Sequence, residues 1–250
     1  MECSLEGKIA LITGGSRGIG RATALAFARA GADIALVSRK LPDLEKAAGE
    51  IKETGRRVLT VSAHMGHAEE IGNVVTGVKE EFGKIDILVN NAGTNPTMAN
   101  ALEIEERAWD SIMNVNVKGL FFLSQTVARL MKEQGGGCII NVASAGGIRP
   151  HILPAYSISK AAVIMATKVM AYEWAQYNIR ANVVAPGLVK TGFSEALWGD
   201  EKIYNYLMQR IPMKRAAETD EIARAMLYLA SDSASFVTGT VLSVDGGETI

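Results

Sequence analysis

Three residues near the middle of the chain have the types and spacing of a proton-transfer site. Tyr156 and Lys160 lie four residues apart, so in a helix their side chains share one face. A nearby positive charge favours the phenolate and lowers the pKa of a tyrosine, which is about 10 in water. Ser144 follows a strand-like run, Cys138–Ala143, and its hydroxyl could hold a substrate oxygen. Because Tyr-x-x-x-Lys also arises by chance in many helices, the pair needs support from elsewhere in the chain.

The elements that must position these residues alternate between strand and helix along the whole chain. Each strand is a short apolar run, and a helical pattern or a loop separates it from the next. A loop broken by Pro150 and Pro154 leads to a helix that we expect to open at Tyr156. The expected strands are 8–13, 33–38, 58–61, 85–90, 138–143, 179–184 and 240–244. This order predicts an α/β fold, with residues 1–250 forming one domain around a Rossmann-type, doubly wound, seven-stranded parallel sheet. Ligands bind such sheets beyond the carboxyl ends of the strands, where Ser144 falls.

A glycine-rich loop connects the first expected strand to the first helix. The loop reads Gly14-Gly-Ser-Arg-Gly-Ile-Gly20, and an alanine-rich helical run, residues 21–30, follows it. Backbone N–H groups at a helix N-terminus, together with the helix dipole, bind phosphate groups. The glycine spacing is not G-x-G-x-x-G, but the strand–loop–helix–strand context is that of a dinucleotide site.

Composition restricts the partners. The chain has 250 residues, 26 basic and 27 acidic, which predicts no general attraction to nucleic acid or to an anionic membrane. No apolar run approaches the roughly 18 residues of a membrane span, and the first residues lack the pattern of a secretory signal. Cys3 and Cys138 are the only cysteines, too few for a disulfide framework. We therefore expect a cytoplasmic protein.

Taken together, these motifs resemble the classical short-chain dehydrogenases/reductases, and the resemblance covers essentially all 250 residues. The matching pieces, in chain order, are Thr13–Gly20, Asn90–Gly93, Asn114–Asn116, Ser144, Tyr156-x-x-x-Lys160, Pro186-Gly187 and Val244–Gly247. The resemblance implies a nicotinamide-dependent oxidoreductase that interconverts a ketone or aldehyde and an alcohol, with a catalytic tetrad of Asn116, Ser144, Tyr156 and Lys160. No metal is implied.

The resemblance also assigns each of these residues a role. Tyr156 is the general acid in reduction and the base in oxidation, and Ser144 hydrogen-bonds the reacting oxygen. Lys160 lowers the pKa of Tyr156 and holds the nicotinamide ribose, while Asn116 fixes a water that links Lys160 to solvent. The implied cofactor-binding residues are Gly14, Ser16, Arg17, Gly18, Ile19, Gly20, Ser38, Arg39, His64, Met65, Asn91, Ala92, Gly93, Tyr156, Lys160, Pro186, Gly187, Val189 and Thr191.

The charges around the second strand favour NADP(H), with NAD(H) as the other possibility. An NAD site places an acidic residue where this chain has Ser38. Arg39 follows it and Arg17 lies in the glycine loop, and guanidinium groups suit a 2′-phosphate. The alternative is that both arginines are solvated surface charges. His64 and Met65 stand where the family usually has an acidic residue near the adenine, which puts that contact in doubt.

Two helical runs are apolar on nearly every side, and a third region resembles a substrate lid. Residues 120–123 and 161–166 lead the two runs, and the sheet can cover only one face of each. We therefore expect a partner subunit, in a homodimer or homotetramer. Residues 191–215 hold many aromatic and aliphatic side chains, which either contact a partly hydrophobic small-molecule substrate or pack on the lid itself. Arg149 and His151 either meet a polar group of the substrate or lie in a solvated loop.

Three other functions deserve comparison with a general carbonyl reductase. Reduction of 3-oxoacyl groups on a carrier protein is one, but the stretches 133–137 and 176–178 lack the basic residues that such enzymes tend to have there. A non-catalytic nucleotide sensor would be expected to have a broken tetrad, and this tetrad is complete. A sugar-nucleotide epimerase or dehydratase would be longer and would carry a separate C-terminal substrate region.

Overall fold

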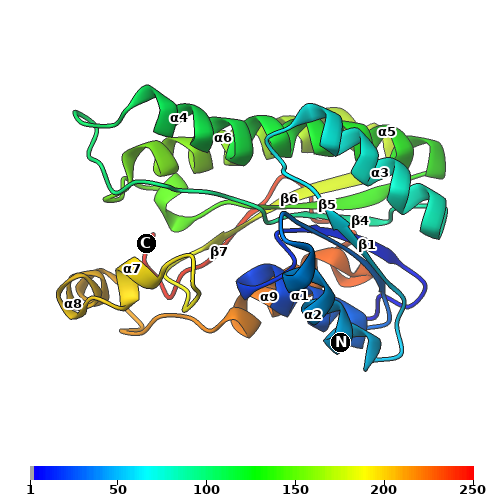
Figure 1. Ribbon diagram of the computed structural model, residues 1–250, viewed down its shortest axis with the longest axis horizontal. Helices are drawn as coiled ribbons and strands as arrows, with labels where there is room; N and C mark the ends of the chain where they lie inside the picture. The colour runs from blue at the N-terminus through cyan, green and yellow to red at the C-terminus, as the bar shows by residue number, and fades with distance from the viewer. Residues whose placement is uncertain (1–2) are drawn as a thin grey trace.

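A seven-stranded parallel sheet lies at the centre of the computed structural model, which describes residues 3–250 (Figure 1). The strands are β1 Ile9–Thr13, β2 Asp33–Ser38, β3 Val58–Ser62, β4 Ile87–Asn90, β5 Gly137–Val142, β6 Ile179–Pro186 and β7 Val241–Val244. Their order across the sheet is β3-β2-β1-β4-β5-β6-β7, and every neighbouring pair is parallel. The order reverses between β1 and β4, where a doubly wound sheet forms its ligand crevice. The fold predicted from the sequence is confirmed.

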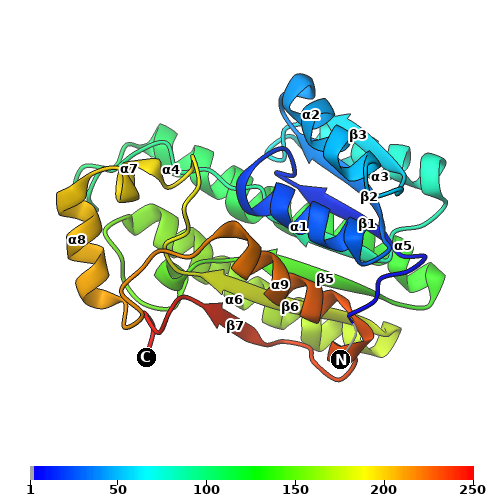
Figure 2. The same ribbon diagram turned by 90° about the horizontal axis from the view of Figure 1, so that it is seen from below.

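Helices cover both faces of the sheet (Figures 1 and 2). On one face lie α1 Gly18–Arg29, α2 Leu41–Lys52 and α9 Thr219–Ala230. On the other lie α3 Ala68–Phe82, α4 Glu106–Met113, α5 Leu120–Gln134 and α6 Pro154–Trp174. Two short helices, α7 Glu195–Trp198 and α8 Glu201–Arg210, lie apart from both layers, at one end of the sheet. Within residues 3–250, no helix has both the length and the apolar character needed to cross a bilayer.

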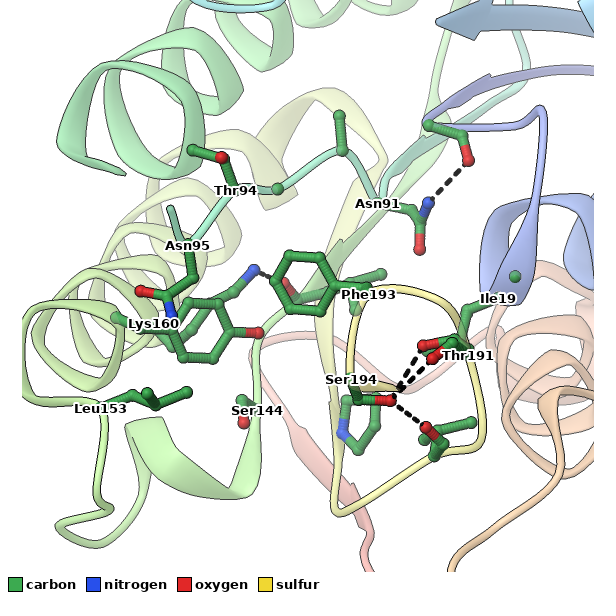
Figure 3. A pocket seen from close by; sticks show the side chains of 18 of the residues that line it. Ile19, Asn91, Thr94, Asn95, Ser144, Leu153, Lys160, Thr191, Phe193 and Ser194 are labelled. Carbon is green, nitrogen blue, oxygen red and sulfur yellow. Dashed lines mark hydrogen bonds between the residues drawn. The ribbon is translucent and has the colours of Figure 1, made fainter. Parts of the chain in front are cut away.

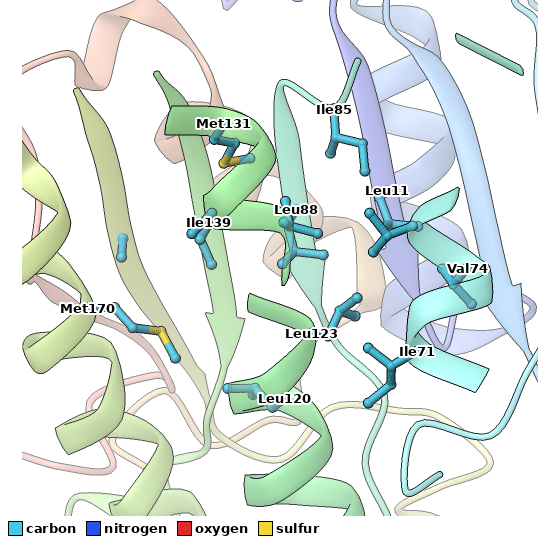
Figure 4. Packing of buried hydrophobic residues seen from close by; sticks show 14 of the residues in the cluster. Leu11, Ile71, Val74, Ile85, Leu88, Leu120, Leu123, Met131, Ile139 and Met170 are labelled. Atoms are coloured by element: carbon cyan, nitrogen blue, oxygen red, sulfur yellow. The ribbon is translucent and has the colours of Figure 1, made fainter. Parts of the chain in front are cut away.

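The strands are apolar on both sides because each face of the sheet carries its own core. Along β1, Ile9 and Leu11 pack into one core and Ala10 and Ile12 into the other. Figure 4 shows the first of these cores, in which strand residues meet side chains of α3 and α5. This two-sided burial explains why the strands lack the alternation of apolar and polar residues typical of a half-exposed sheet.

Element boundaries differ from the sequence predictions by one or two residues at several ends. The largest functional difference is α6, which begins at Pro154 and not at Tyr156. Proline has no N–H to leave unpaired in a first helical turn, so it fits there without cost. Tyr156 therefore lies inside the first turn of α6, and Lys160 lies one turn further along the same helix.

A π-helical turn, Asn114–Gly119, connects α4 directly to α5 and was not predicted. Such turns are rare and often lie at functional sites. The turn brings the backbone of Gly119 against the loop after β3, where a Cβ atom on Gly119 would lie 1.7 Å from the carbonyl oxygen of Met65. Only glycine fits this contact, which joins the helix carrying Asn116 to a loop beside the sheet.

We predict that Gly119→Ala lowers the free energy of unfolding. The loss should be no smaller than the value typical of overpacking, about 1–3 kcal/mol, because a backbone carbonyl cannot move aside as a side chain can. Gly72→Ala in α3 is the matched control, since nothing lies within 4 Å of its added Cβ. Replacing an exposed helical glycine by alanine stabilises by about 0.5–1 kcal/mol. Urea unfolding measures both changes, and a Gly119→Ala protein as stable as wild type would contradict the contact.

Candidate active site

A cavity of about 510 Å³ opens beyond the carboxyl ends of the central strands (Figure 3). The glycine loop, the segments that follow β4, β5 and β6, and residues of α7 and α8 line it. The cavity brings together Ser144, Tyr156, Lys160 and every predicted cofactor-binding residue except Gly20. Asn116 and Gly20 do not line the cavity, but they contact the segments that form its wall.

The glycine loop forms one side of the cavity because its backbone needs conformations that favour glycine. Gly14 and Gly18 have φ values of 65° and 55°, in the left-handed region. A Cβ atom on Gly20 would lie 2.3 Å from the carbonyl oxygen of Gly14, so Gly20 lets helix α1 start tightly against the loop. Helix α1 has no side-chain cap on its first N–H groups, which leaves them available to a phosphate.

Asn91 fastens the segment after β4 to the glycine loop. Its amide Nδ2 donates hydrogen bonds to the carbonyl oxygens of Thr13, at 3.0 Å, and Gly14, at 3.2 Å. The hydroxyl of Thr13 accepts hydrogen bonds from the backbone N–H groups of Asn91 and Ala92, both at 3.1 Å. The two loops therefore form one preorganised wall at the point where the strand order reverses.

Two guanidinium groups lie at the end of the cavity near β2. Arg17 and Arg39 line the cavity, both are exposed, and neither has an ion-pair partner among residues 3–250. Ser38, the last residue of β2, lines the same end, and no acidic side chain in the described chain lines it. This end of the cavity is therefore suited to an anion.

His64 occupies the position where the family usually has an acid. Its ring stacks on His67 with centroids 4.4 Å apart, and its Nδ1 accepts a hydrogen bond from the N–H of Gly66. Burial, and next the charge of His67, lower its pKa, so the ring is neutral at pH 7. With Nδ1 acting as acceptor, the ring proton lies on Nε2. The cavity wall here offers an imidazole in place of a carboxylate.

Lys160 is held almost completely inside the protein. Its side chain is 3% exposed, and its Nζ donates a 2.7 Å hydrogen bond to the carbonyl oxygen of Val142, at the end of β5. Burial lowers the pKa of Lys160 to about 8. Its Nζ lies 5.5 Å from the centre of the Tyr156 ring. A cation is thus fixed beneath the tyrosine by the sheet itself.

Ser144 and Tyr156 both line the cavity, one just before and one just after the loop that precedes α6. The hydroxyl of Ser144 accepts a 3.1 Å hydrogen bond from the N–H of Gly146, which fixes its orientation. Burial raises the pKa of Tyr156 to about 12, while the Ser144 hydroxyl acts in the opposite direction. We expected Lys160 to lower this pKa, whereas burial of the phenol is the largest cause and raises it. Tyr156 is therefore a neutral phenol that carries its proton at pH 7.

Asn116 is fully buried and ties three segments together. Its Oδ1 accepts from the N–H of Thr94 at 2.8 Å, and its Nδ2 donates to the Thr94 carbonyl and to the Ser159 hydroxyl, both at 3.0 Å. These bonds hold the segment after β4 against α6. One acceptor position on Oδ1 is not used by these bonds, and both Oδ1 and the Nζ of Lys160 lie within 3.6 Å of where a Cβ on Gly93 would be.

The remaining wall comes from the segments after β4 and β6, from the loop before α6 and from the C-terminal turn. Phe193 lies over Tyr156 with ring centres 5.9 Å apart, and Leu153 and Asn95 face the same space (Figure 3). His151 lines the cavity, whereas Arg149 does not. Glu248, close to the C-terminus, also lines it and was not predicted. No local pattern marks Glu248, since it reaches the site only through the tertiary fold.

Comparison with known proteins agrees with the resemblance to the short-chain dehydrogenases/reductases. Residues 14–249 match the model of a family described as enoyl-(acyl carrier protein) reductase. The chain is 40% identical to 2-dehydro-3-deoxy-D-gluconate 5-dehydrogenase of Dickeya dadantii (strain 3937), over 98% of this chain and 96% of the relative. It is 40% identical to a 3-oxoacyl-[acyl-carrier-protein] reductase of Thermotoga maritima, over 97% and 98%.

A solved structure shares the fold over the whole chain. L-Sorbose reductase from Gluconobacter frateurii, complexed with NADPH and L-sorbose, superposes with a TM-score of 0.93 at 36% identity and covers 100% of this chain and 99% of its own. Together with the cavity beyond the sheet and the intact Ser144, Tyr156 and Lys160 arrangement, these matches show that the chain belongs to the classical short-chain dehydrogenases/reductases and is an NAD(P)(H)-dependent oxidoreductase.

Proposed function

We propose that this protein is an NADP(H)-preferring reductase of a small ketone or aldehyde, with Tyr156 as the proton donor. The observation that carries the proposal is the convergence of Tyr156, Ser144 and a buried Lys160 on one cavity wall. When bound, the nicotinamide cofactor supplies or accepts the hydride. The protein supplies the proton, the position of the substrate oxygen and the electrostatic environment.

The proton chemistry follows from the environment of each side chain. Tyr156, with its pKa raised to about 12 by burial, keeps its proton at pH 7 and can release it to an oxygen that gains negative charge. Ser144, oriented by Gly146, donates a hydrogen bond to the same oxygen. Burial lowers the pKa of Lys160 to about 8, so its ammonium can give up a proton close to neutral pH. A water held between Lys160 and the free acceptor position of Asn116 Oδ1 would then resupply the proton.

We propose that residues 191–215 form the lid over this site. The two ends of the lid are joined at its base, where Lys190 N–H donates to Ala217 C=O and Ala217 N–H donates to Leu188 C=O. Between them, Leu207, Met208 and Ile211 form a small core of their own, while Phe193 reaches toward Tyr156. Such a segment can move as one body while its base stays paired. It contributes both to its own core and to the cavity wall.

A 3-oxoacyl reductase is the second candidate. The Thermotoga maritima relative at 40% identity favours it. The stretches 133–137 and 176–178 supply only one charged side chain, Glu133, where a carrier protein, which is acidic, would need bases. We therefore propose a free small molecule as the substrate. A cytoplasmic location, with no nucleic-acid or membrane partner, stays a prediction from charge and cysteine content.

Tyr156→Phe should reduce turnover by about 10²–10⁴-fold while NADPH binding stays nearly unchanged, because only the proton-carrying hydroxyl is lost. Tyr172→Phe is the matched control, since Tyr172 lies on the same helix and is 89% exposed. Steady-state rates on a panel of ketones measure turnover, and quenching of protein fluorescence by NADPH measures binding. Wild-type rates in Tyr156→Phe on every substrate would exclude the assignment.

The preference for NADP(H) rests on Arg39 and Arg17 at an acid-free end of the cavity. Both guanidinium groups are free to pair with a 2′-phosphate, and the small Ser38 side chain leaves room for it. His64, which is neutral, adds a donor and no negative charge that would repel the phosphate. An NAD site needs a carboxylate at the end of β2 to accept the ribose hydroxyls, and none is present there.

The double variant Ser38→Asp, Arg39→Ser should therefore invert the preference toward NAD(H). Loss of one charge-assisted hydrogen bond should weaken NADPH binding by about 10- to 100-fold, and Arg17 should retain part of the affinity. Lys40→Ser is the control, because Lys40 is an exposed neighbour that does not line the cavity. The measurement is kcat/KM with each cofactor at fixed substrate. A wild type that prefers NADH would refute the proposal.

We also propose a homodimer or homotetramer that buries the outer faces of α5 and α6. Apolar side chains remain exposed on these helices, with exposures of 44% for Phe122, 60% for Met165 and 43% for Val169. A stripe of this kind on the outer layer of the molecule is typical of a subunit interface.

Light scattering at micromolar concentration should give a dimer or larger. Met165→Glu should shift the assembly toward the 26.7 kDa monomer, because a carboxylate would be buried in an apolar contact. Leu102→Glu, at a 98% exposed loop position outside these helices, should leave it unchanged. A monomeric wild-type protein would contradict the proposed subunit interface.

A further inference from the structure

Glu248 is a buried residue whose carboxylate opens to the cavity and has no protein partner among residues 3–250. The residue is 4% exposed and lines the cavity wall, yet its carboxylate oxygens make no hydrogen bond or ion pair within residues 3–250. A buried carboxylate is costly unless it is hydrogen-bonded. Its neighbour Asp245 shows the usual solution, since its two oxygens accept from Gly247 N–H, Thr249 N–H and the Thr249 hydroxyl. The oxygens of Glu248 are available to a ligand.

The position of Glu248 is fixed by other residues. The turn that carries it is closed by the Asp245 side chain and by a hydrogen bond from Glu248 N–H to Asp245 C=O. Met213 N–H donates to Gly246 C=O, and Gly187 N–H donates to Val244 C=O, so the turn is seated between β6 and the segment after α8. Both figures of the whole molecule place the chain end at the end of the molecule that carries α7 and α8 (Figures 1 and 2). Because its carboxylate has no structural bond, the side chain can be changed without opening the turn.

His151, from the loop before α6, lines the same cavity. Burial lowers its pKa, as do the charges of Arg210 and Arg149, so its imidazole is neutral and offers one donor and one acceptor. Burial raises the pKa of Glu248, as does the charge of Asp245, while the same two arginines act in the opposite direction. Neither arginine lines the cavity. A ligand at this end therefore meets a carboxylate acceptor and a neutral imidazole.

We propose that Glu248 and His151 bind hydroxyl groups of the substrate, which is then a polyhydroxylated ketone or aldehyde. Hydroxyl groups donate to a carboxylate and both donate to and accept from an imidazole. An ammonium group fits less well, because Arg149 and Arg210 already place two positive charges nearby. An anionic or purely alkyl substrate would leave the carboxylate unpaired. This inference rests on the proposed reductase function, whose substrate class it specifies.

The test compares binding of hydroxylated and hydroxyl-free ketones of equal chain length. Hexuloses (D-fructose, L-sorbose, D-tagatose and D-psicose) and 2-hexanone are titrated into the NADPH-loaded variant Tyr156→Phe, in which turnover is slow, and binding is followed by ligand-observed NMR. The variants are Glu248→Gln, His151→Gln and the control Glu195→Gln. Glu195 is an exposed carboxylate on α7 that does not line the cavity.

At least one hexulose should bind more tightly than 2-hexanone, and Glu248→Gln should weaken that hexulose by about 10- to 100-fold, as expected for a hydrogen bond to a charged group. His151→Gln should weaken it less. Binding of 2-hexanone, NADPH affinity and melting temperature should not change, and Glu195→Gln should match its parent.

Two results would overturn the inference: 2-hexanone binding as tightly as every hexulose, or Glu248→Gln weakening both ligand classes equally. Because binding is measured without turnover, the two proposals fail separately. Wild-type protein that binds a hexulose through Glu248 but oxidises no NADPH with any ketone would refute the proposed reductase and leave the recognition site standing.

Discussion

The hydrogen bond from the Lys160 ammonium to the carbonyl oxygen of Val142 is the contact on which the site depends. It places a cation where water scarcely reaches, and it joins α6 to the end of β5 at a 2.7 Å distance. Tyr156 lies one helical turn earlier on the same helix, so fixing Lys160 also fixes the phenol. Removing a charged group from water disfavours its charged form, so burial lowers the pKa of Lys160 to about 8. A lysine with a pKa of about 8 changes its protonation state close to neutral pH, whereas a lysine with the ordinary pKa of about 10.4 stays protonated there.

A second set of contacts transmits the position of α6 to the loop after β4. Asn116 bonds both backbone groups of Thr94 and the Ser159 hydroxyl, and Ser159 in turn donates to the Tyr156 carbonyl oxygen at 2.7 Å. Asn116 lies in a π-turn, which shifts it relative to an unbroken helix and allows all of these bonds at once. Its place behind the wall makes it a positioning residue for Tyr156 as well as a candidate anchor for water.

The sequence was sufficient for features that depend on local pattern. Apolar runs of strand length located the strands of the sheet, and the glycines after β1 located the loop proposed to bind the cofactor, in which Gly14 and Gly18 have left-handed backbone conformations. Pro154 was placed in the loop before the helix, whereas it begins α6. The sign of the Tyr156 pKa shift could not be predicted either, since spacing along a helix gives the charge nearby but not the degree of burial. Glu248 was missed because the turn that carries it packs against residues 211–213, which are distant from it in the sequence.

The charges of the described residues that line the cavity divide it into two ends with opposite preferences. Arg17 and Arg39 lie at the end near β2, where no acidic side chain lines the wall, while Glu248 is the acidic residue of the other end. An elongated anionic cofactor is attracted to the end that Arg17 and Arg39 line, which favours an orientation with its phosphates there. That orientation leaves the Glu248 end to an uncharged ligand, and Tyr156 lies between the two.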